Sequence, residues 1–353
     1  MTSYGASNLS VKHVLQDATR NSRPPLALLS VTETDLEHWR TTLRHELWAL
    51  LGGPGQLVTP NVEVLTRVSE RGFTRSLLHY ETEPGVTTSA WLLEPAQNDR
   101  RPRPGFLALH GHGSGKDDVV GVADSIDARH HIAERNYDYG RQLVRRGYVV
   151  LVPDARGFGA RASAEGCHVP GLVALYQGRC IAGQRLWDDL RSLDVLAGLA
   201  NVDAHRLCCG GLSEGGKRSL LLAALDERVC LTVVSGYFTS LRAEIEAWDR
   251  LTGWDICNAI PGLLRVADLP DVAALIAPRR LVIEIGRADS LYTQAAVLQG
   301  FNQARVAWEM LDVADGVALD HFDGGHEWSG RIAYKWLRDL VDRPSAMLDP
   351  GRL

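Results

Sequence analysis

The sequence predicts an α/β fold with a mostly parallel central sheet and helices on both of its faces. From about residue 106 onward, short apolar segments typical of strands alternate with longer amphipathic segments typical of helices. This alternation indicates parallel strands joined by crossover helices. The chain has 353 residues, 45% of them hydrophobic, and neither an internal repeat nor a low-complexity linker divides it. We therefore expect one large domain rather than two.

Residues 1–60 are expected to form a helical extension outside a main domain that covers residues 61–345. The first thirty residues are polar and predict irregular structure. A helix is expected to begin at Thr32–Asp35, where a threonine can cap it, and to end at Gly52–Gly55. Its apolar residues recur at helical spacing: Leu36, Trp39, Leu43, Leu47 and Leu50.

Three short segments with strand character come next, at Val62–Val68, Phe73–Glu81 and Thr87–Leu93. They lie close together in sequence and are separated by turn residues, which predicts an antiparallel meander at one edge of the sheet. The alternating part follows. Its expected strands are 106–110, 148–152, 206–210, 230–235, 281–285 and 305–311, and its expected helices are 133–146, 181–199, 213–225, 291–302 and 329–341.

Charge and composition exclude several classes of partner. The net charge of −5 does not favour nucleic acid or an anionic membrane. We expect no signal peptide and no membrane span, because the N-terminus has no apolar core and no run approaches ~20 apolar residues. The cysteines at 167, 180, 208, 209, 230 and 257 show no C-x-x-C spacing, so buried free thiols in a cytoplasmic protein are expected. A Cys167–Cys180 disulfide is the alternative, and a homo-oligomer is left open.

The stretch around Ser213 carries the clearest chemical signal. Gly211-x-Ser213-x-Gly215 follows an apolar run and precedes a helix-forming run. A sharp strand-to-helix turn can project a serine hydroxyl into a pocket, at the cost of strained backbone at the serine. The serine would then lie at a helix N-terminus, which favours developing negative charge. The alternative is an ordinary turn in which Ser213 only caps the helix.

Two further polar residues are expected at the same edge of the sheet, because ligands bind at the carboxyl ends of parallel strands. His326 lies in a glycine-rich loop and is the expected general base, with a surface histidine as the alternative. Asp289 follows an expected strand and can fix the imidazole tautomer, with a helix cap as the alternative. The competing acids are Asp315, Asp320 and Asp323.

The turn at Gly111-His112-Gly113 can direct backbone N–H groups at an oxyanion, together with the N–H of Glu214. A phosphate loop is the alternative, but Asp117 follows Lys116 where a P-loop needs Ser or Thr. A metal site at His110-x-His112 or His130-His131 lacks partner ligands at useful spacing. We therefore expect neither a metal nor a cofactor.

Taken together, these motifs resemble the α/β-hydrolase superfamily, in its dienelactone-hydrolase-like and acetyl-xylan-esterase-like branch of carboxylesterases. The resemblance covers roughly residues 87–341 and leaves 1–86 and 160–178 poorly constrained. It implies hydrolysis of an ester by a Ser-Asp-His triad without a cofactor, with Ser213 as nucleophile, Asp289 as acid and His326 as base. The matching pieces are Leu109-His110-Gly111-His112-Gly113, Asp154-Ala155-Arg156-Gly157-Phe158-Gly159, Trp187-Asp188-Asp189-Leu190-Arg191-Ser192-Leu193-Asp194, Gly211-Leu212-Ser213-Glu214-Gly215-Gly216, Ile260-Pro261-Gly262-Leu263-Leu264 with Leu275-Ile276-Ala277-Pro278-Arg279, and Phe322-Asp323-Gly324-Gly325-His326.

Residues 237–269 lie between two expected strands and are rich in large apolar side chains, so we expect them to form a lid over the serine. Trp248 and Trp254 are the expected substrate contacts, and plain core packing is the alternative. The predicted function is hydrolysis of a small-molecule acyl or acetyl ester through an acyl-enzyme. The alternatives are an acyltransferase or cyclase, a C–C or amide hydrolase with the same triad, and a binding module without chemistry.

Overall fold

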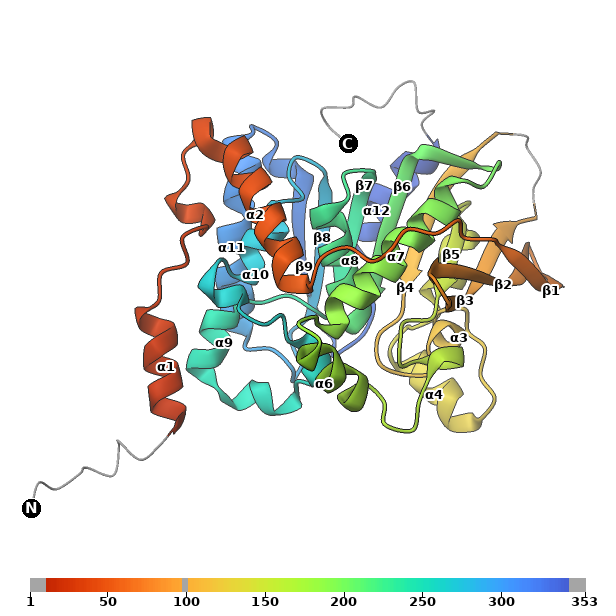
Figure 1. Ribbon diagram of the computed structural model, residues 1–353. Coiled ribbons are helices and arrows are strands. Elements are labelled where there is room, and N and C mark those ends of the chain that lie inside the picture. The colour runs from red at the N-terminus through yellow and green to blue at the C-terminus, as the bar shows by residue number, and fades with distance from the viewer. Residues whose placement is uncertain (1–10, 97–100, 343–353) are drawn as a thin grey trace, which may run out of the picture.

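A computed structural model describes residues 11–96 and 101–342 of the chain (Figure 1). The described residues form one nine-stranded sheet in the order β1-β2-β3-β5-β4-β6-β7-β8-β9. The pairs β1–β2, β2–β3 and β3–β5 are antiparallel, and every pair from β5–β4 to β8–β9 is parallel. The predicted α/β class and the antiparallel meander at one edge are both confirmed.

The strands are β1 (Glu63–Glu70), β2 (Phe73–Glu83), β3 (Val86–Pro95), β4 (Arg103–Leu109), β5 (Val149–Pro153), β6 (Val202–Leu212), β7 (Val229–Ser235), β8 (Arg280–Gly286) and β9 (Val317–Phe322). The helices are α1 (Val11–Asn21), α2 (Leu36–Leu51), α3 (Lys116–Val119), α4 (Ile126–Glu134), α5 (Tyr139–Val144), α6 (His168–Tyr176), α7 (Ile181–Ala197), α8 (Glu214–Leu225), α9 (Leu241–Ala247), α10 (Leu269–Ala274), α11 (Gln294–Met310) and α12 (Ala333–Asp342).

Successive side chains of a strand point to opposite faces of the sheet. Helices cover both faces of the parallel strands, so both sets of side chains are buried. On β4, Leu107 and Leu109 belong to one core cluster, while Phe106 and Ala108 belong to the other. The first cluster lies under α2, α7, α8, α10 and α11, and the second lies under α5 and α12 (Figure 1). The central strands are thus predominantly apolar on both faces, as their sequences predict.

The predicted strand at 305–311 is wrong. Residues 305–310 continue α11, which ends at Met310, and the last strand is β9. The buried residues of α11 keep helical spacing through the whole segment: Ala296, Val297, Gly300, Ala304, Ala307 and Trp308. Gly300 does not break the helix but lets it approach another segment, since a Cβ there would lie 3.0 Å from the backbone nitrogen of Ser240.

Two other local predictions also need correction. The single helix expected at 133–146 is two helices, α4 and α5, separated by Asn136 in the left-handed region at φ 48°. The amide of Asn136 donates a 2.8 Å hydrogen bond to the carbonyl of Trp328, and this contact accompanies the break. The irregular structure expected for residues 1–30 is interrupted by α1, while residues 1–10 lie outside the described residues.

The N-terminal extension is joined to the main domain by packing and by hydrogen bonds. The buried side of α2, including Trp39 and Leu43, is part of the same core cluster as the sheet. Gln16 Nε2 on α1 donates to the carbonyl of Glu246, and the Leu26 N–H donates to the carbonyl of Val266. The extension therefore contacts the predicted lid directly. A domain boundary near residue 60 stays a prediction.

The six cysteines are buried and unpaired, as expected, and Cys167 and Cys180 form no disulfide. Within the two described stretches, none of the helices combines the length and the apolar character needed to cross a bilayer.

Candidate active site

Ser213 occupies a strained turn between β6 and α8, with φ 61° and ψ −121°. Its N–H donates a 2.8 Å hydrogen bond to the carbonyl of Ser235 at the end of the neighbouring strand β7. The flanking glycines are required by space, since a Cβ on Gly211 or Gly215 would lie 2.0 or 1.8 Å from the Leu109 carbonyl oxygen. The turn therefore has the backbone of a nucleophile elbow, with strain concentrated at the serine.

His326 and Asp289 lie on two loops at the same edge of the sheet. The Nδ1–H of His326 donates to Asp289 Oδ2 at 2.7 Å, and the other carboxylate oxygen accepts from the Leu291 N–H at 3.0 Å. The Asp289 side chain is fully buried, whereas the His326 ring is 22% exposed. The Ala288 N–H also donates to the Gly324 carbonyl, which holds the two loops together.

Two of the three competing acids have other partners. Asp320 accepts a 2.7 Å hydrogen bond from the Ser329 hydroxyl, and the exposed Asp323 pairs with Arg287. Asp315 lies in a short turn that precedes β9. Of these four acids, Asp289 is the one whose carboxylate accepts the hydrogen bond from His326.

One cavity of about 530 Å³ joins the catalytic candidates. Ser213 and His326 both line it, and its apolar wall includes three aromatic side chains from the lid side: Tyr237, Trp254 and Tyr292. A site of this kind, mostly apolar with a few convergent polar groups, is typical of a small-molecule pocket.

The turn after β4 offers fewer free donors than the sequence indicates. The Gly111 N–H donates to the Tyr137 hydroxyl at 2.7 Å, so it is not available to an oxyanion. The N–H groups of His112 and Glu214 have no hydrogen-bond acceptor within residues 11–96 and 101–342. These two remain the candidate oxyanion donors, and Tyr137 fixes the turn that carries one of them.

The Glu214 side chain has a role separate from its N–H. It is fully buried between Arg185, at 2.8 Å, and Lys217, at 2.7 Å. Burial alone would raise the pKa of Glu214, but the two cations lower it to about 2. The carboxylate is therefore ionised at neutral pH and anchors the first turn of α8 to α7.

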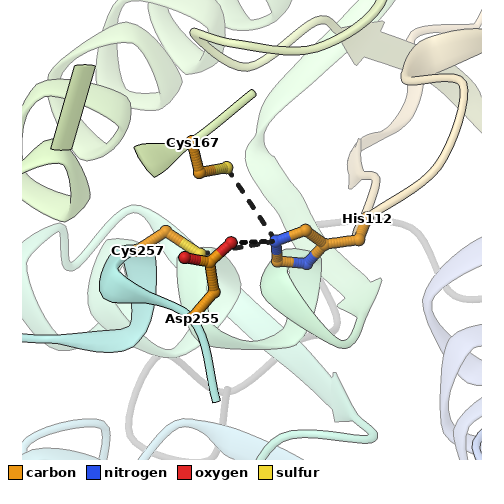
Figure 2. Close-up of side chains that lie close together, drawn as sticks. All are labelled: His112, Cys167, Asp255 and Cys257. Atoms are coloured by element: carbon orange, nitrogen blue, oxygen red, sulfur yellow. Dashed lines mark hydrogen bonds and ion pairs between the residues drawn. The ribbon is translucent and has the colours of Figure 1, made fainter. Parts of the chain in front are cut away.

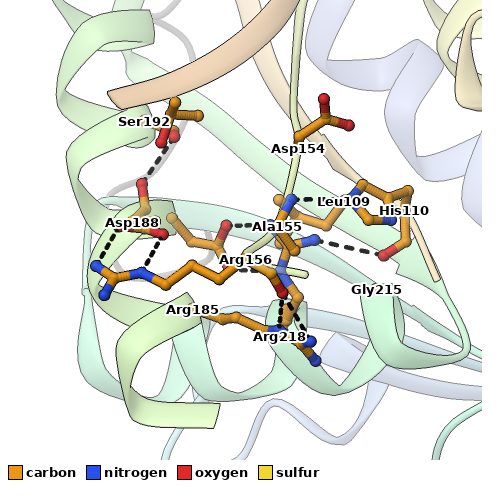
Figure 3. Close-up of polar contacts among 12 residues, drawn as sticks. Leu109, His110, Asp154, Ala155, Arg156, Arg185, Asp188, Ser192, Gly215 and Arg218 are labelled. Atoms are coloured by element: carbon orange, nitrogen blue, oxygen red, sulfur yellow. Dashed lines mark hydrogen bonds and ion pairs between the residues drawn. The ribbon is translucent and has the colours of Figure 1, made fainter. Parts of the chain in front are cut away.

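A buried polar network supports the elbow from below, and Figure 3 shows its residues. His110 Nε2 accepts from the Ala155 N–H at 2.9 Å, and Arg218, paired with Asp189, donates to the His110 carbonyl. Burial, with help from Arg218, holds the pKa of His110 well below its usual range, so the ring stays neutral. His110 is thus a structural residue that connects the strand ends.

A second part of this network joins the loop after β5 to α7. Arg156 binds Asp188 through two 2.8 Å hydrogen bonds, and Arg185 donates to the Arg156 carbonyl (Figure 3). Arg156 and Asp188 belong to segments that carry the family resemblance, whereas Arg185 lies outside those segments. Their physical role is to hold strand-end loops by charge-assisted hydrogen bonds.

The two tryptophans of the lid segment have different surroundings. Trp254 lines the Ser213 cavity, whereas Trp248 does not. Trp248 lines a second, mostly apolar cavity of about 600 Å³ between α1 and α9, and Trp254 lines this cavity too. Lys12 on α1 lies over the Trp248 ring at 5.9 Å. The structure therefore places Trp248 outside the Ser213 cavity, contrary to the expectation from the sequence. Its neighbours include α1, a helix that the sequence did not predict.

Sequence reasoning also missed several residues that shape the pocket. Tyr137, Tyr237 and Tyr292 have no distinguishing local motif, and only the fold brings them to the cavity. Asp255 and Asn258 of the lid line both cavities. His112 faces Asp255 together with Cys167 and Cys257, and this group is a candidate for holding a metal among the described residues.

Comparisons with known proteins agree with this architecture. The model of the Abhydrolase family matches residues 4–346. "Putative hydrolase YtaP" of Bacillus subtilis (strain 168) is 26% identical over 309 residues, which cover 85% of this chain and 98% of that protein.

Solved structures show the same fold at low identity. The crystal structure of a putative acetyl xylan esterase from Bacteroides fragilis has a TM-score of 0.75 at 19% identity, covering 96% of this chain and 91% of that one. A glucuronoyl esterase from Solibacter usitatus has a TM-score of 0.65 at 18% identity, covering 86% and 92%. Acetyl xylan esterase 1 from Thermoanaerobacterium sp. has a TM-score of 0.60 at 18% identity, covering 84% and 93%.

Proposed function

The chain belongs to the Abhydrolase family, and from this premise we propose that it is a serine carboxylesterase that cleaves an acyl or acetyl ester of a small molecule. One observation carries the proposal. Ser213, on a strained elbow, and His326, held by Asp289, open onto the same cavity. A nucleophile, a base and a residue that orients the base are the parts that acyl transfer through a covalent intermediate needs.

In the proposed mechanism, His326 Nε2 takes the hydroxyl proton of Ser213 while Oγ attacks the ester carbonyl. Asp289 holds the imidazole in the tautomer with the proton on Nδ1 and stabilises the imidazolium that forms. The N–H groups of His112 and Glu214 bind the oxyanion of the tetrahedral intermediate. His326 then gives its proton to the leaving alcohol, which leaves an acyl-enzyme.

The second half of the reaction repeats these steps with water. His326 removes a proton from water, and the resulting hydroxide attacks the acyl carbonyl. The bond between the acyl carbon and Ser213 Oγ then breaks, and His326 returns its proton to Oγ. The products are a carboxylic acid and the free enzyme. Protein groups supply every proton transfer, so the proposed chemistry needs no cofactor.

The choice of an acyl or acetyl ester rests on two kinds of support. The Ser213 cavity combines aromatic walls with His131 and Arg135, and can hold a small substrate with a polar part. The similar structures described above are named acetyl xylan esterases and a glucuronoyl esterase, and these names describe enzymes that act on esters. The buried free thiols favour a reducing compartment such as the cytoplasm.

The test combines a panel of p-nitrophenyl esters of graded chain length with a fluorophosphonate probe. We expect hydrolysis of short esters and a label on the peptide that contains Ser213. Ser213→Ala should lower kcat by roughly 10⁴–10⁶ and abolish labelling with little change in melting temperature. Ser240→Ala is a control at a buried serine outside this cavity. An active Ser213→Ala enzyme, or a label on another residue, would contradict the proposal.

A further inference from the structure

Four side chains with metal-binding atoms meet at the wall of the Ser213 cavity (Figure 2). His112 lies on the turn after β4, Cys167 precedes α6, and Asp255 and Cys257 belong to the lid. The Nε2 atom of His112 lies 3.4 Å from Cys257 Sγ, 3.9 Å from Cys167 Sγ and 4.0 Å from Asp255 Oδ2. All four ligand atoms lie within 4.8 Å of one another.

These separations are close to those of a tetrahedral metal site. With metal–ligand bonds of about 2.0–2.3 Å, the ligand atoms of a tetrahedron are about 3.3–3.8 Å apart. The three separations from His112 Nε2 therefore lie within the tetrahedral range or exceed it by less than an ångström, and the remaining three, all within 4.8 Å, need to close by at most about 1.5 Å. The donor set is two sulfurs, one imidazole nitrogen and one carboxylate oxygen, which suits the borderline-soft Zn²⁺ better than Mg²⁺ or Ca²⁺.

We propose that His112, Cys167, Asp255 and Cys257 form a structural zinc site that fastens the lid and the 160–178 segment to the turn after β4. On binding, the two thiols lose their protons to solvent and the four ligand atoms each form one bond to the ion. Cys167 and Cys257 are buried, while the side chains of His112 and Asp255 are 42% and 45% exposed and face the cavity. The ion can therefore enter from the cavity side.

The charges around the cluster support this assignment. Arg185 Nη2 donates to Cys167 Sγ at 3.0 Å, and Lys217 donates to the carbonyl of Cys257. Both cations are fully buried and share the single carboxylate of Glu214, which leaves one buried positive charge in excess. Zinc with two thiolates, one carboxylate and a neutral imidazole carries one net negative charge. A filled site thus balances the charge of its buried surroundings.

Local sequence spacing could not predict this site, because its residues come from separate segments of the chain. Local spacing pairs His112 with His110, two residues before it, but His110 Nε2 accepts a hydrogen bond from the Ala155 N–H instead. The actual partners of His112 come from segments more than fifty residues away along the chain. The expectation of no metal rested on local spacing and is replaced by this proposal.

A bound ion at this site would hold separate segments of the chain together. The ion would join three segments that already meet by packing and by the contacts of His112 Nε2 with Cys167 Sγ and Cys257 Sγ, and one of them carries the candidate oxyanion N–H of His112. Zinc here orients a backbone donor and the lid, and it does not take part in the ester chemistry. The metal site is therefore independent of the proposed esterase function, and its binding can be measured without a substrate.

The first test measures metal content and spectroscopy on the full chain, purified under reducing conditions. We expect one zinc ion per chain by elemental analysis. After chelation and titration with Co²⁺, we expect a thiolate-to-cobalt charge-transfer band and the intense visible bands of tetrahedral cobalt. Cobalt that gives no thiolate band with the fully reduced wild-type protein overturns the proposal, whatever the esterase activity.

The second test uses matched cysteine variants. Cys167→Ser and Cys257→Ser should each lose the thiolate band or shift it, and weaken metal binding by at least tenfold. Cys180→Ser, at an equally buried thiol outside the cluster, should keep both band and affinity. Asp255→Asn, which alters an exposed ligand and should fold, is expected to weaken binding while the band remains. Metal affinity that is unchanged in both cluster cysteine variants, or a Cys167–Cys257 disulfide in metal-free protein purified anaerobically, overturns the proposal.

Discussion

The Nδ1–H of His326 donates a 2.7 Å hydrogen bond to the carboxylate of Asp289, and that carboxylate has no solvent exposure. A buried acceptor of this kind fixes one tautomer of the imidazole. The other oxygen of Asp289 accepts from the Leu291 N–H, so the carboxylate itself cannot rotate freely. The two residues thus behave as one unit, and the orientation of His326 depends on Asp289.

Asp289→Asn should lower kcat by up to ~10⁴, because an amide that turns its NH₂ group toward Nδ1 selects the wrong tautomer. The measurement is kcat and KM with one activated ester. Asp323→Asn is the control, since Asp323 is an exposed acid near His326 that pairs with Arg287. If Asp323→Asn proves as damaging as Asp289→Asn, the acid of the triad has been misassigned.

Tyr137→Phe should lower kcat and also destabilise the fold. Its hydroxyl accepts from the Gly111 N–H at 2.7 Å, and a buried N–H left without a partner costs about 1–3 kcal/mol. The turn that presents the His112 N–H would then lose its anchor. Burial raises the pKa of Tyr137, so the hydroxyl stays protonated over the working pH range.

Tyr139→Phe is the matched control for Tyr137. Its hydroxyl is also buried and donates at 2.7 Å to the Leu109 carbonyl, but it does not contact the Gly111–His112 turn. We expect both variants to lower the melting temperature, and only Tyr137→Phe to lower kcat strongly. Equal losses of kcat would show that the hydroxyl of Tyr137 has no special part in positioning the turn.

Glu284 should make stability depend on pH. It lies at the end of β8 and accepts hydrogen bonds from the N–H groups of Ser329 and Gly330, just after His326. Burial raises its pKa from 4.5 to about 7. Between these pH values the unfolded chain loses this proton while the folded chain keeps it. The free energy of unfolding should therefore fall as pH rises from about 4.5 to about 7.

The measurement is urea unfolding of the wild type and Glu284→Gln at several pH values. The stability of the wild type relative to the variant should fall across this window by up to about 3 kcal/mol, since one pKa unit is worth about 1.4 kcal/mol. Other titrating groups cancel in the difference between the two proteins. A difference that stays flat from about pH 5 to 7 would show that Glu284 ionises normally in the folded chain.

Trp254→Ala and Trp248→Ala should have different effects. Trp254 lines the Ser213 cavity and packs against Tyr237 and Tyr292, so its loss should change the ratio of kcat/KM between short and long esters. Trp248 lines the second cavity and not the Ser213 cavity, so its loss should leave this ratio for short esters unchanged. Melting temperatures of both variants separate lost packing from changed preference. An unchanged ester preference in Trp254→Ala, with a large drop in melting temperature, would leave Trp254 as scaffold.

Local sequence was enough for the features that depend on neighbouring residues. Gly211, Ser213 and Gly215 predict the elbow because a strained turn between strand and helix has few residue choices, and the structure has the positive φ at Ser213. The order of strands also placed Asp289 and His326 at one sheet edge, because parallel strands end on the same side. For 305–311, short apolar runs suit a helix or a strand equally well, and the prediction failed there.

Only the tertiary structure decided which distant side chains share a surface. Tyr137 reaches the Gly111 N–H, Trp248 lies against α1 rather than against Ser213, and His112 meets Cys167, Asp255 and Cys257. No periodicity or spacing in the chain records these contacts, since each depends on how separate loops cross the end of the sheet. By itself the sequence determined the α/β class, the elbow and the edge of the sheet where the chemistry is proposed. The geometry of the pocket wall required the fold, because the hydrogen bonds and packing that set it are made between residues far apart in the chain.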